Sequence, residues 1–272
     1  MTRRIIVSLL VGVLLLGFAA PFQAVADTCT FTATSGVWNS AGNWSCSGSE
    51  DIPDSDDLVV IPSGKTCAVD ADEDARSLLS VQGTLNVEAG NTLSLHGSAG
   101  TASAAVQGDG VVNLEGSGSV LAFLVDGIFV SEGSPGKVVG ANDNAKILLE
   151  NATTLTNNVN IEGRLQITED AGDDATFHNQ GTVHANAAGT LYINTDVISD
   201  TSGFRWKVST NSSAVLRLEP TNATAPVLAA DFHVEAGTLD VQNTVNTTGD
   251  LFFTGGKITV RASEAIQFRT PT

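Results

Sequence analysis

Apolar and polar residues alternate along most of the chain in short runs that predict β-strands. Apolar residues two positions apart recur, as at Leu85 and Val87 and again at Leu239 and Val241. Each run is followed by Gly, Asn, Asp or Ser, which are the residues that form tight turns. A period of two indicates a strand with one buried face. No window of about eleven residues carries the helical period, so the pattern predicts an all-β chain without long helices.

The predicted strands form a repeat. The element G-x-L-x-V/I begins at Gly83, Gly163, Gly189 and Gly237. Recurrent modules of this kind indicate stacked units that bury their faces only against their neighbours, with rungs of roughly twenty to thirty residues. Aromatic residues make up only 6% of the chain, and small apolar residues suit a narrow interior. We predict a right-handed parallel β-helix, with a β-sandwich as the alternative.

The N-terminus has the pattern of a secretory signal peptide. Arg3 and Arg4 precede the apolar run Ile5–Ala20, and Ala24–Ala26 has the A-x-A form of a cleavage site. The run is shorter than the roughly 20 residues that span a bilayer, and no later stretch is long enough. We therefore predict a signal peptide over residues 1–26, no membrane span after its cleavage, and a secreted, extracellular or cell-surface protein.

Removal of the signal peptide makes the chain more acidic. The full sequence holds 13 basic and 30 acidic residues, of which two arginines lie in the signal peptide, so the mature chain has a net charge of −19. This charge repels nucleic acid and anionic lipid. We expect no nucleic-acid partner, and the acidic surface favours cations such as Ca²⁺.

All three cysteines lie in the first quarter of the chain. An exported protein can keep a disulfide, and the spacing lacks the CxxC or nearby His of a zinc site. We predict a disulfide between Cys46 and either Cys29 or Cys67. It would staple the segment that contains Trp38 and Trp44.

Composition divides the mature chain in two. Residues 27–97 hold two of the three tryptophans and all cysteines, and we expect an N-terminal cap there that covers the open edge of the first rungs. Residues 98–272 carry the regular rhythm of the solenoid. Its last rung would have an open edge, so one hypothesis is that the chain is the N-terminal part of a longer surface protein.

The start of the mature chain contains a recognisable pattern. Two tryptophans are followed by a proline and an acidic turn, then by D-x-V-x-I-x-x-G and by L-x-V-x-G-x-L. The residues are Trp38, Trp44, Pro53, Asp57, Val59, Ile61, Gly64, Leu79, Val81, Gly83 and Leu85. This pattern resembles the G8 module of extracellular β-helix proteins and the start of many secreted bacterial β-helix proteins, although the glycines of the G8 pattern are only partly present. The resemblance implies a surface-associated adhesive or glycan-contacting role and transfers no catalytic residues.

Two acidic clusters flank strand-like runs near the N-terminus. Asp54 and Asp57 precede LVVI, and Asp70, Asp72 and Asp74 follow TCAV. Ca²⁺ binds six to eight oxygens, and crowded carboxylates repel one another unless they are neutralised. These five aspartates are therefore our candidate metal ligands. The spacing lacks the EF-hand loop and the glycine-rich Ca²⁺ repeat, so solvated turns are the alternative.

The mature chain has one aromatic–basic cluster, in the segment GFRWKVS. We hypothesise that Trp206 and Arg205 bind a ligand there, with the indole ring as a platform for sugar stacking. The alternative is a strand with two inward side chains.

A further acidic segment raises an enzymatic alternative. TEDAGDDATFHN contains Glu169, Asp170, Asp173, Asp174 and His178, and glycoside hydrolysis needs two carboxyl groups that flank the scissile bond. The rival hypothesis is a polysaccharide-active β-helix enzyme, either a lyase or a glycoside hydrolase. Few basic residues lie near these acids, however, and we assign no catalytic residues.

The sequence therefore predicts an exported, acidic β-solenoid that acts as an adhesive or structural binding module. Its partners would be extracellular glycans or surface proteins, contacted along the lateral faces with or without the help of Ca²⁺. The sequence does not identify the ligand.

Overall fold

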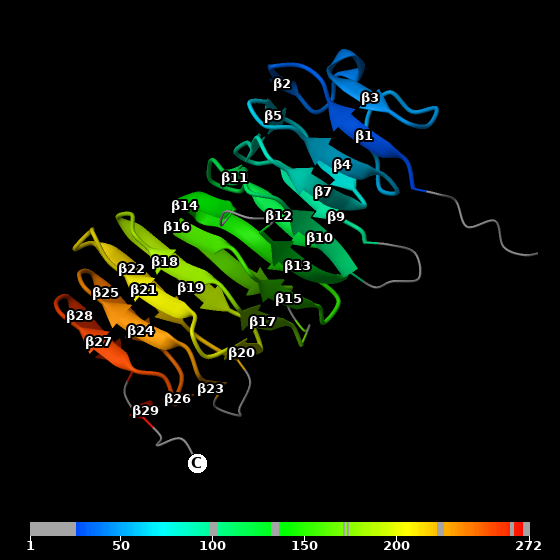
Figure 1. Ribbon diagram of the computed structural model, residues 1–272. Coiled ribbons are helices and arrows are strands. Elements are labelled where there is room, and N and C mark those ends of the chain that lie inside the picture. Colours follow the sequence, from blue (N-terminus) through cyan, green and yellow to red (C-terminus); the bar gives the residue numbers. More distant parts are fainter. Residues whose placement is uncertain are drawn as a thin grey trace, which may run out of the picture.

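The chain folds into a β-solenoid, in which short strands stack as successive coils along one axis (Figure 1). The computed structural model describes residues 26–97, 103–131, 136–170, 172, 174–221, 226–261 and 264–268. The signal peptide is a prediction for residues that lie, except for Ala26, outside this range. One short 3-10 helix, Ala41–Asn43, interrupts the strands. None of the described helical structure is long and apolar enough to cross a membrane.

The strands form three sheets that run along the solenoid. The nine-stranded sheet contains β1 (Thr28–Phe31), β3 (Trp44–Cys46), β4 (Leu58–Ile61), β7 (Ser77–Val81), β10 (Ser103–Gln107), β13 (Asp126–Val130), β15 (Thr154–Asn157), β17 (Thr176–Asn179) and β20 (Val197–Asp200). The three-stranded sheet contains β23 (Val227–Leu228), β26 (Val245–Thr247) and β29 (Ile266–Phe268).

The 17-stranded sheet forms the rest of the wall. It contains β2 (Ser35–Val37), β5 (Thr66–Val69), β6 (Glu73–Ala75), β8 (Thr84–Val87), β9 (Thr92–Leu95), β11 (Val111–Leu114), β12 (Val120–Phe123), β14 (Lys137–Leu149), β16 (Asn160–Glu169), β18 (Thr182–Ala185), β19 (Gly189–Asn194), β21 (Arg205–Val208), β22 (Ala214–Leu218), β24 (Asp231–Val234), β25 (Thr238–Val241), β27 (Leu251–Phe253) and β28 (Lys257–Val260).

Neighbouring coils pair in parallel and in register. Leu85 on β8 pairs with Val112 on β11, which pairs with Val138 on β14 and then with Ile161 on β16. These steps take 27, 26 and 23 residues, within the predicted length of a rung. Parallel stacking of successive coils confirms the predicted β-helix architecture, and the β-sandwich alternative is wrong.

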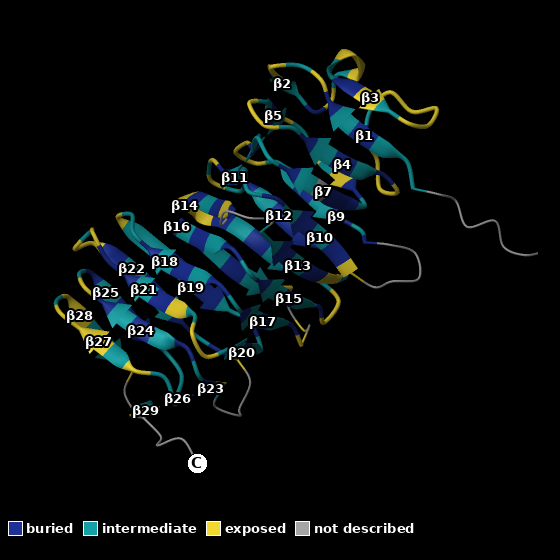
Figure 2. Cartoon of the chain, in the orientation of Figure 1, coloured by how far each residue is buried: buried dark blue, intermediate teal, exposed yellow. Residues whose placement is uncertain are grey.

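The interior is filled by the apolar residues of the period-two pattern. Leu85, Val87, Leu239 and Val241 are all buried, and the burial pattern of most strands alternates along the chain (Figure 2). Because successive side chains of a strand point to opposite faces, each coil buries one set of side chains and presents the other set on a lateral face.

The glycines of the G-x-L-x-V/I element lie where two coils approach closely. A Cβ atom at Gly83 would lie within 3.0 Å of the backbone oxygens of Lys65 and Pro62, and one at Gly163 would meet the carbonyl oxygen of Gly140. Real Cβ atoms essentially never approach so closely. At Gly83 and Gly163 the repeat therefore reflects a steric requirement between the backbones of successive coils.

The N-terminal end departs from the parallel pattern. Strand β3 runs antiparallel to β1 on the side away from β4, and Cys29 forms a disulfide with Cys46, its partner in the register. This finding decides between the two predicted pairings, and Cys67 is a buried free thiol. Trp38 and Trp44 are both buried, and the Trp44 indole N–H donates to the Trp38 carbonyl oxygen at 2.6 Å.

Candidate functional site

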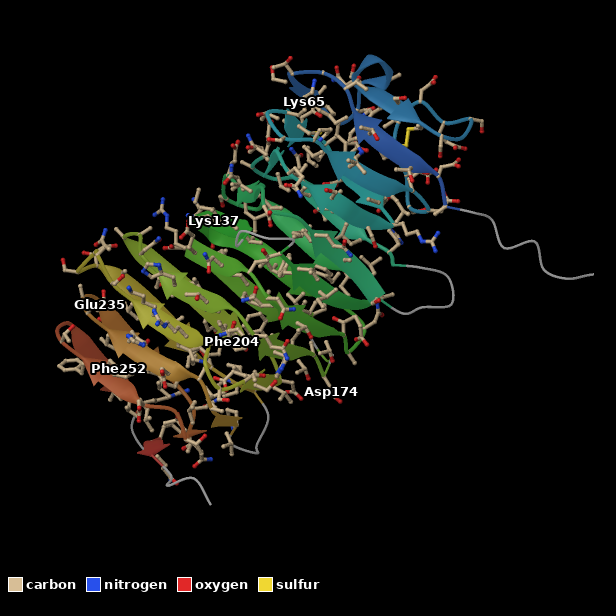
Figure 3. All side chains as sticks on the ribbon, viewed as in Figure 1. Lys65, Lys137, Asp174, Phe204, Glu235 and Phe252 are labelled. Carbon is tan, nitrogen blue, oxygen red and sulfur yellow. A yellow bond between two sulfur atoms is a disulfide. The ribbon has the colours of Figure 1, made fainter. Side chains whose placement is uncertain are left out.

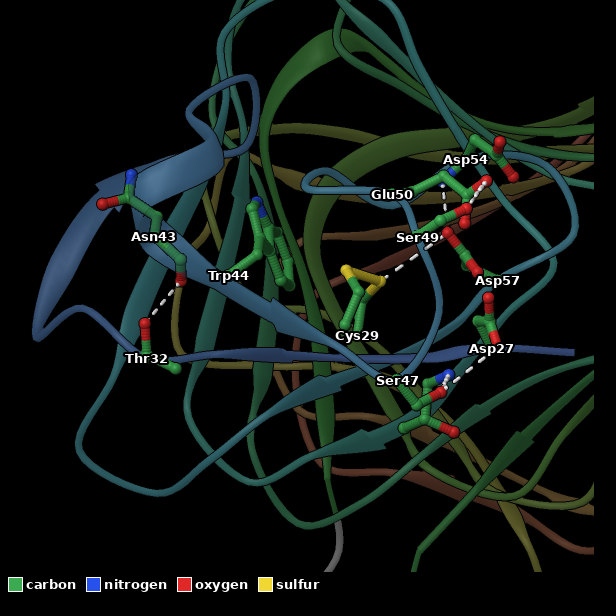
Figure 4. Close-up of a disulfide and its surroundings, with 12 residues drawn as sticks. Asp27, Cys29, Thr32, Asn43, Trp44, Ser47, Ser49, Glu50, Asp54 and Asp57 are labelled. Atoms are coloured by element: carbon green, nitrogen blue, oxygen red, sulfur yellow. Dashed lines mark hydrogen bonds between the residues drawn. A yellow bond between two sulfur atoms is a disulfide. The ribbon is translucent and has the colours of Figure 1, made fainter.

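Five carboxylates gather at the N-terminal end, and Figure 4 shows four of them, Asp27, Glu50, Asp54 and Asp57, near the disulfide. They form two groups, Asp27 with Glu50 and Asp57, and Asp54 with Asp56 and Asp57; in each group the potential ligand oxygens all lie within 4.8 Å of one another. Asp57 belongs to both groups and is only 2% exposed. No Lys or Arg occurs from residue 27 to residue 57, so this segment contains no cation that could offset the acidic charge.

A tight turn before β4 places Asp57. Its backbone N–H donates to the carbonyl oxygen of Asp54 at 3.2 Å, and its Oδ2 accepts from the Asp54 N–H at 3.0 Å. The Asp56 N–H donates to Asp54 Oδ1 at 3.0 Å, which is the Asx-type bonding that aspartate favours in turns. Asp57 Oδ2 also lies 3.6 Å from the Cys29 sulfur, which has no hydrogen to donate in a disulfide.

The crowding of these acids changes their ionisation. Burial raises the pKa of Asp57, and the charges of Asp54, Glu50 and Asp27 raise it further. The hydrogen bond and the charge of Asp54 raise the pKa of Asp56. A nearby cation favours the ionised carboxylate. The cluster thus offers oxygen ligands of the kind that a hard cation such as Ca²⁺ prefers.

The second predicted cluster does not assemble. The carboxylate of Asp72 accepts from the Thr92 N–H at 2.8 Å, and Asp74 Oδ1 lies 2.8 Å from His96 Nε2. Asp70 belongs to neither of the two close carboxylate groups that occur among the described residues. Asp72 and Asp74 each bond to the following coil instead of to a shared centre, and a cation site at Asp70, Asp72 and Asp74 stays a prediction.

Trp206 lies inside the solenoid. It is 1% exposed, and its indole N–H donates to Asp200 Oδ2 at 2.6 Å. Its ring stacks on Phe232 with centroids 6.3 Å apart and meets Phe177 edge-on at 6.2 Å. The prediction of an exposed sugar platform at Trp206 is wrong, because Trp206 occupies an inward position of the strand and the interior takes its ring.

The neighbours of Trp206 on β21 face outward instead. Arg205 is exposed, and Lys207 pairs in register with His184 on β18 and with His233 on β24, which in turn pairs with Phe252 on β27. Neighbouring strands lie about 4.8 Å apart, so these side chains form a regular column on one lateral face. We name the residues of this surface the lateral stripe: His184, Arg205, Lys207, His233 and Phe252.

The lateral stripe combines an aromatic surface with cations. Phe252 is 45% exposed and its ring stacks on the imidazole of His233, with centroids 4.5 Å apart and planes at 19°. Lys207 Nζ lies 3.1 Å from Glu235 Oε1. Figure 3 labels Phe252 and Glu235 near the C-terminal end of this face.

Both histidines of the stripe favour the neutral form. Burial lowers the pKa of His184, and the charge of Lys207 lowers it further. Burial and the charge of Arg205 do the same to the pKa of His233. Near pH 7 the positive charge of the stripe is therefore that of Arg205 and Lys207.

The structure does not bring together the described acidic residues of the segment TEDAGDDATFHN, which suggested an enzyme. Glu169 Oε2 accepts from the N–H groups of Ala175 and Asp196, both at 2.9 Å. The Thr221 hydroxyl lies 3.2 Å from Glu169 Oε1 and 2.6 Å from Asp196 Oδ1. The structure therefore brings Glu169 together with Asp196 across two coils, a pairing that the sequence did not reveal.

Asp170 and Asp174 belong to neither of the two close carboxylate groups that occur among the described residues. Asp170 and Asp174 are exposed, and Asp173 lies outside the described residues. His178 Nδ1 lies 2.7 Å from the Ser199 hydroxyl and its Nε2 lies 2.9 Å from Gln180 Nε2. These contacts use both ring nitrogens of His178 within the wall of the solenoid.

Two signals in the sequence could have revealed the residues that we missed. Asp27 and Glu50 flank Cys29 and Cys46, so their approach follows once that disulfide is known. The outward column of the lateral stripe occupies the third position of TVHA, RWKV and DFHV, three four-residue strands with the same alternation. Aligning these strands as successive coils would have placed His184, Lys207 and His233 in one column.

Comparison with family models, with curated proteins and with solved structures gives no match for this chain. The similarity to the G8 module thus stays a prediction that rests on the residues of the N-terminal pattern.

Proposed function

We propose that the protein is a secreted or cell-surface β-solenoid that binds an extended polysaccharide along the lateral stripe. The observation that carries this proposal is the in-register column of His184, Lys207, His233 and Phe252 on β18, β21, β24 and β27, with Arg205 exposed on the same strand as Lys207. Arginine and lysine bind the carboxylate and other oxygen groups of such a ligand, and the exposed ring of Phe252 offers an apolar surface on which a sugar can stack.

The regular spacing of the coils supports an extended ligand over a small one. Contacts repeated along a rigid face act together, so that weak individual contacts yield a higher overall affinity. The resemblance to the G8 module supports the same role, because it implies glycan contact or adhesion outside the cell.

A glycan array with the chain from Asp27 onward tests this proposal. The best polysaccharide is then titrated against the double variant Arg205→Ser/Phe252→Ser, for which we expect at least roughly tenfold weaker binding, since both residues are expected to contact the ligand. The matched control is Lys146→Ser, which removes a cation from β14 outside the stripe. Unchanged affinity in the double variant would refute the assignment.

The enzymatic alternative has its own readout in the same experiment. Release of reducing ends or of unsaturated products from the bound polysaccharide would favour a glycoside hydrolase or a lyase. Glu169 and Asp196 would then be the first residues to replace, because the fold brings their carboxylates to a common hydroxyl group.

Calcium binding at the N-terminal carboxylates is a separate part of the proposal. A ligand that binds only the folded state stabilises it, by about 2.7 kcal/mol at a concentration one hundred times its dissociation constant. We expect millimolar Ca²⁺, compared with EDTA, to raise the midpoint of thermal unfolding. The increase should be lost in Asp54→Asn/Asp56→Asn and kept in Asp72→Asn. The absence of any increase would identify these carboxylates as parts of solvated turns.

A further inference from the structure

The two permanent cations of the lateral stripe each have a carboxylate beside them. Lys207 Nζ lies 3.1 Å from Glu235 Oε1, and Arg205 pairs in register with Asp231 on the following coil. The stripe and these two neighbours therefore have no net charge while the histidines are neutral. Because the mature chain as a whole carries a net charge of −19, a polyanion then meets a balanced stripe on an acidic protein, which disfavours binding.

His184 lies among groups of both signs. The charged side chains that face it from the neighbouring elements are Glu162 on β16, Lys207 on β21, Lys137 on β14 and Glu235 after β24. Lys137 Nζ lies 2.8 Å from Glu162 Oε1, so this pair is balanced too. The Nε2 atom of His184 lies 2.6 Å from the Ser209 hydroxyl. A hydroxyl can donate to a neutral imidazole and accept from a protonated one, so this contact is compatible with both states of the ring.

His233 occupies the equivalent position two coils further on. The charged side chains that face it are Arg205 and Lys207 on β21, Asp231 on its own strand β24 and Glu235 after that strand. Strand β27 packs on its other side with the ring of Phe252 and contains no charged residue. The Nε2 atom of His233 is buried and has no hydrogen-bond partner in the part of the chain that the structure describes.

We propose that the lateral stripe binds an anionic polysaccharide and that binding is coupled to protonation of His184 and His233. The proposal rests on the function proposed above and names its substrate class, a polymer that carries carboxylate or sulfate groups. Lys207 lies between the two histidines in the register. Protonation therefore places three cations on successive coils, about 4.8 Å apart, and each can donate charge-assisted hydrogen bonds to the oxyanions of an extended chain.

The direction of the coupling follows from charge. In the free protein the pKa values of both histidines are lowered from the ordinary value of 6.5, whereas a bound oxyanion favours the imidazolium form. Binding therefore takes up protons, and the affinity rises as the pH falls. Lysine and arginine keep their charge in this range, and exposed carboxylates lose theirs only near about pH 4. The change between about pH 8 and about pH 5 is thus that of the histidines.

Dextran sulfate tests the proposal, because its sulfate groups stay ionised throughout this range and neutral dextran is its uncharged control. Isothermal titration calorimetry measures binding to the chain from Asp27 onward at about pH 5 and about pH 7.5, at one ionic strength. We expect dextran sulfate to bind at least roughly tenfold more tightly at the acidic pH. Proton uptake should appear as a binding heat that depends on the ionisation enthalpy of the buffer. Dextran should show neither effect.

Three variants assign the effect to the stripe. His184→Gln/His233→Gln cannot gain charge, so it should bind like the unmodified chain at neutral pH and lose the gain at acidic pH. His96→Gln is the matched control and should keep the gain, because His96 lies just after β9, outside the stripe. Glu235→Gln removes the carboxylate beside the lysine of the stripe and should tighten binding at neutral pH. Far-UV circular dichroism checks folding at both pH values, and the single His→Gln variants replace the double variant if it unfolds.

Several results would overturn the proposal. These are equal affinity at the two pH values, a gain that persists in the folded double variant, loss of the gain in His96→Gln, or no binding of dextran sulfate at either pH. A neutral polysaccharide that binds the stripe when dextran sulfate does not would refute the anionic substrate and leave the proposed function standing. Failure of dextran sulfate and of every polysaccharide on the glycan array would refute both.

Discussion

At the scale of single residues, the short distance between the backbones of successive coils limits which side chains fit at certain positions. A Cβ atom at Gly181 would collide with the carbonyl oxygen of Val159 in the coil before it, although Gly181 does not adopt a positive φ angle. At this position glycine is therefore needed for space alone. Gly42, in contrast, has open space around its Cα atom.

We predict that Gly181→Ala lowers the free energy of unfolding by about 1–3 kcal/mol, since an added methyl group in a packed site forces the backbone to shift. Gly42→Ala is the matched control and should change it by less than about 0.5 kcal/mol. Urea unfolding of both variants measures the difference. Equal stability of the two would mean that the coils can separate at Gly181 without cost.

The ionisation of Asp57 provides a second prediction at this scale. Burial raises its pKa above the ordinary value of 3.8, so the folded state holds the proton more tightly than the unfolded state does. Its contribution to stability is complete below pH 3.8 and is lost as the pH rises through the folded-state pKa. Asp57→Asn cannot ionise but keeps an oxygen that can accept the Asp54 N–H.

We therefore expect Asp57→Asn to reduce the loss of stability that accompanies rising pH in the acidic range. Urea unfolding at several pH values, in the presence of a chelator, measures this effect. The control is Asp51→Asn, which changes an exposed carboxylate of the same segment. A steeper loss in Asp57→Asn than in the unmodified chain would show that the sign of the Asp57 contribution is wrong.

At the scale of elements, the N-terminal strands depend on the disulfide. Strand β3 has only three residues, and its described pairing is with β1 alone. The bond between Cys29 and Cys46 closes a loop with a sequence separation of 17 residues. Closing a loop of this length contributes about 3 kcal/mol by restricting the unfolded chain.

We predict that a reducing agent lowers the thermal midpoint of the chain and increases hydrogen exchange in β1 and β3. The variant Cys29→Ala/Cys46→Ala should have the lower midpoint from the start and should not respond to the reducing agent. A chain whose midpoint is insensitive to reduction would show that β3 stays in place without the bond.

The strands themselves could be predicted from the sequence, but their neighbours could not. The alternation of apolar and polar residues identified the buried positions at Leu85 and Leu239. The recurring G-x-L-x-V/I element indicated that the strands stack as repeated coils. Which residues meet across coils depends on the register, and the register depends on turn lengths that vary from coil to coil. For this reason the sequence could not show that Asp74 meets His96, or that Asp196 joins Glu169.

The position of Trp206 shows the same limit in another form. An aromatic residue between Arg205 and Lys207 was consistent with a surface site or with an inward strand position. The alternation of RWKV alone left both open. The decisive fact is that Phe232 and Phe177 lie on neighbouring coils and surround the indole.

At the scale of the whole molecule, the fold is a column with two different ends and a continuous wall. The N-terminal end has an antiparallel strand and buried tryptophans, whereas Phe253 and Val260 are exposed in the last described coils. Each coil contacts mainly the coils before and after it, so the stability of the column is close to a sum over neighbouring pairs. The lateral faces are then free to vary without changing the interior.

This nearest-neighbour stacking has a kinetic consequence. Contacts between coils link residues only about one coil apart, as in the 23-residue step from Val138 to Ile161, and short separations in sequence favour rapid folding. A coil can form on a folded neighbour as a template, so folding can begin at one coil and propagate along the column. A lesion in one coil would then interrupt this propagation at that coil and leave the coils on either side able to form.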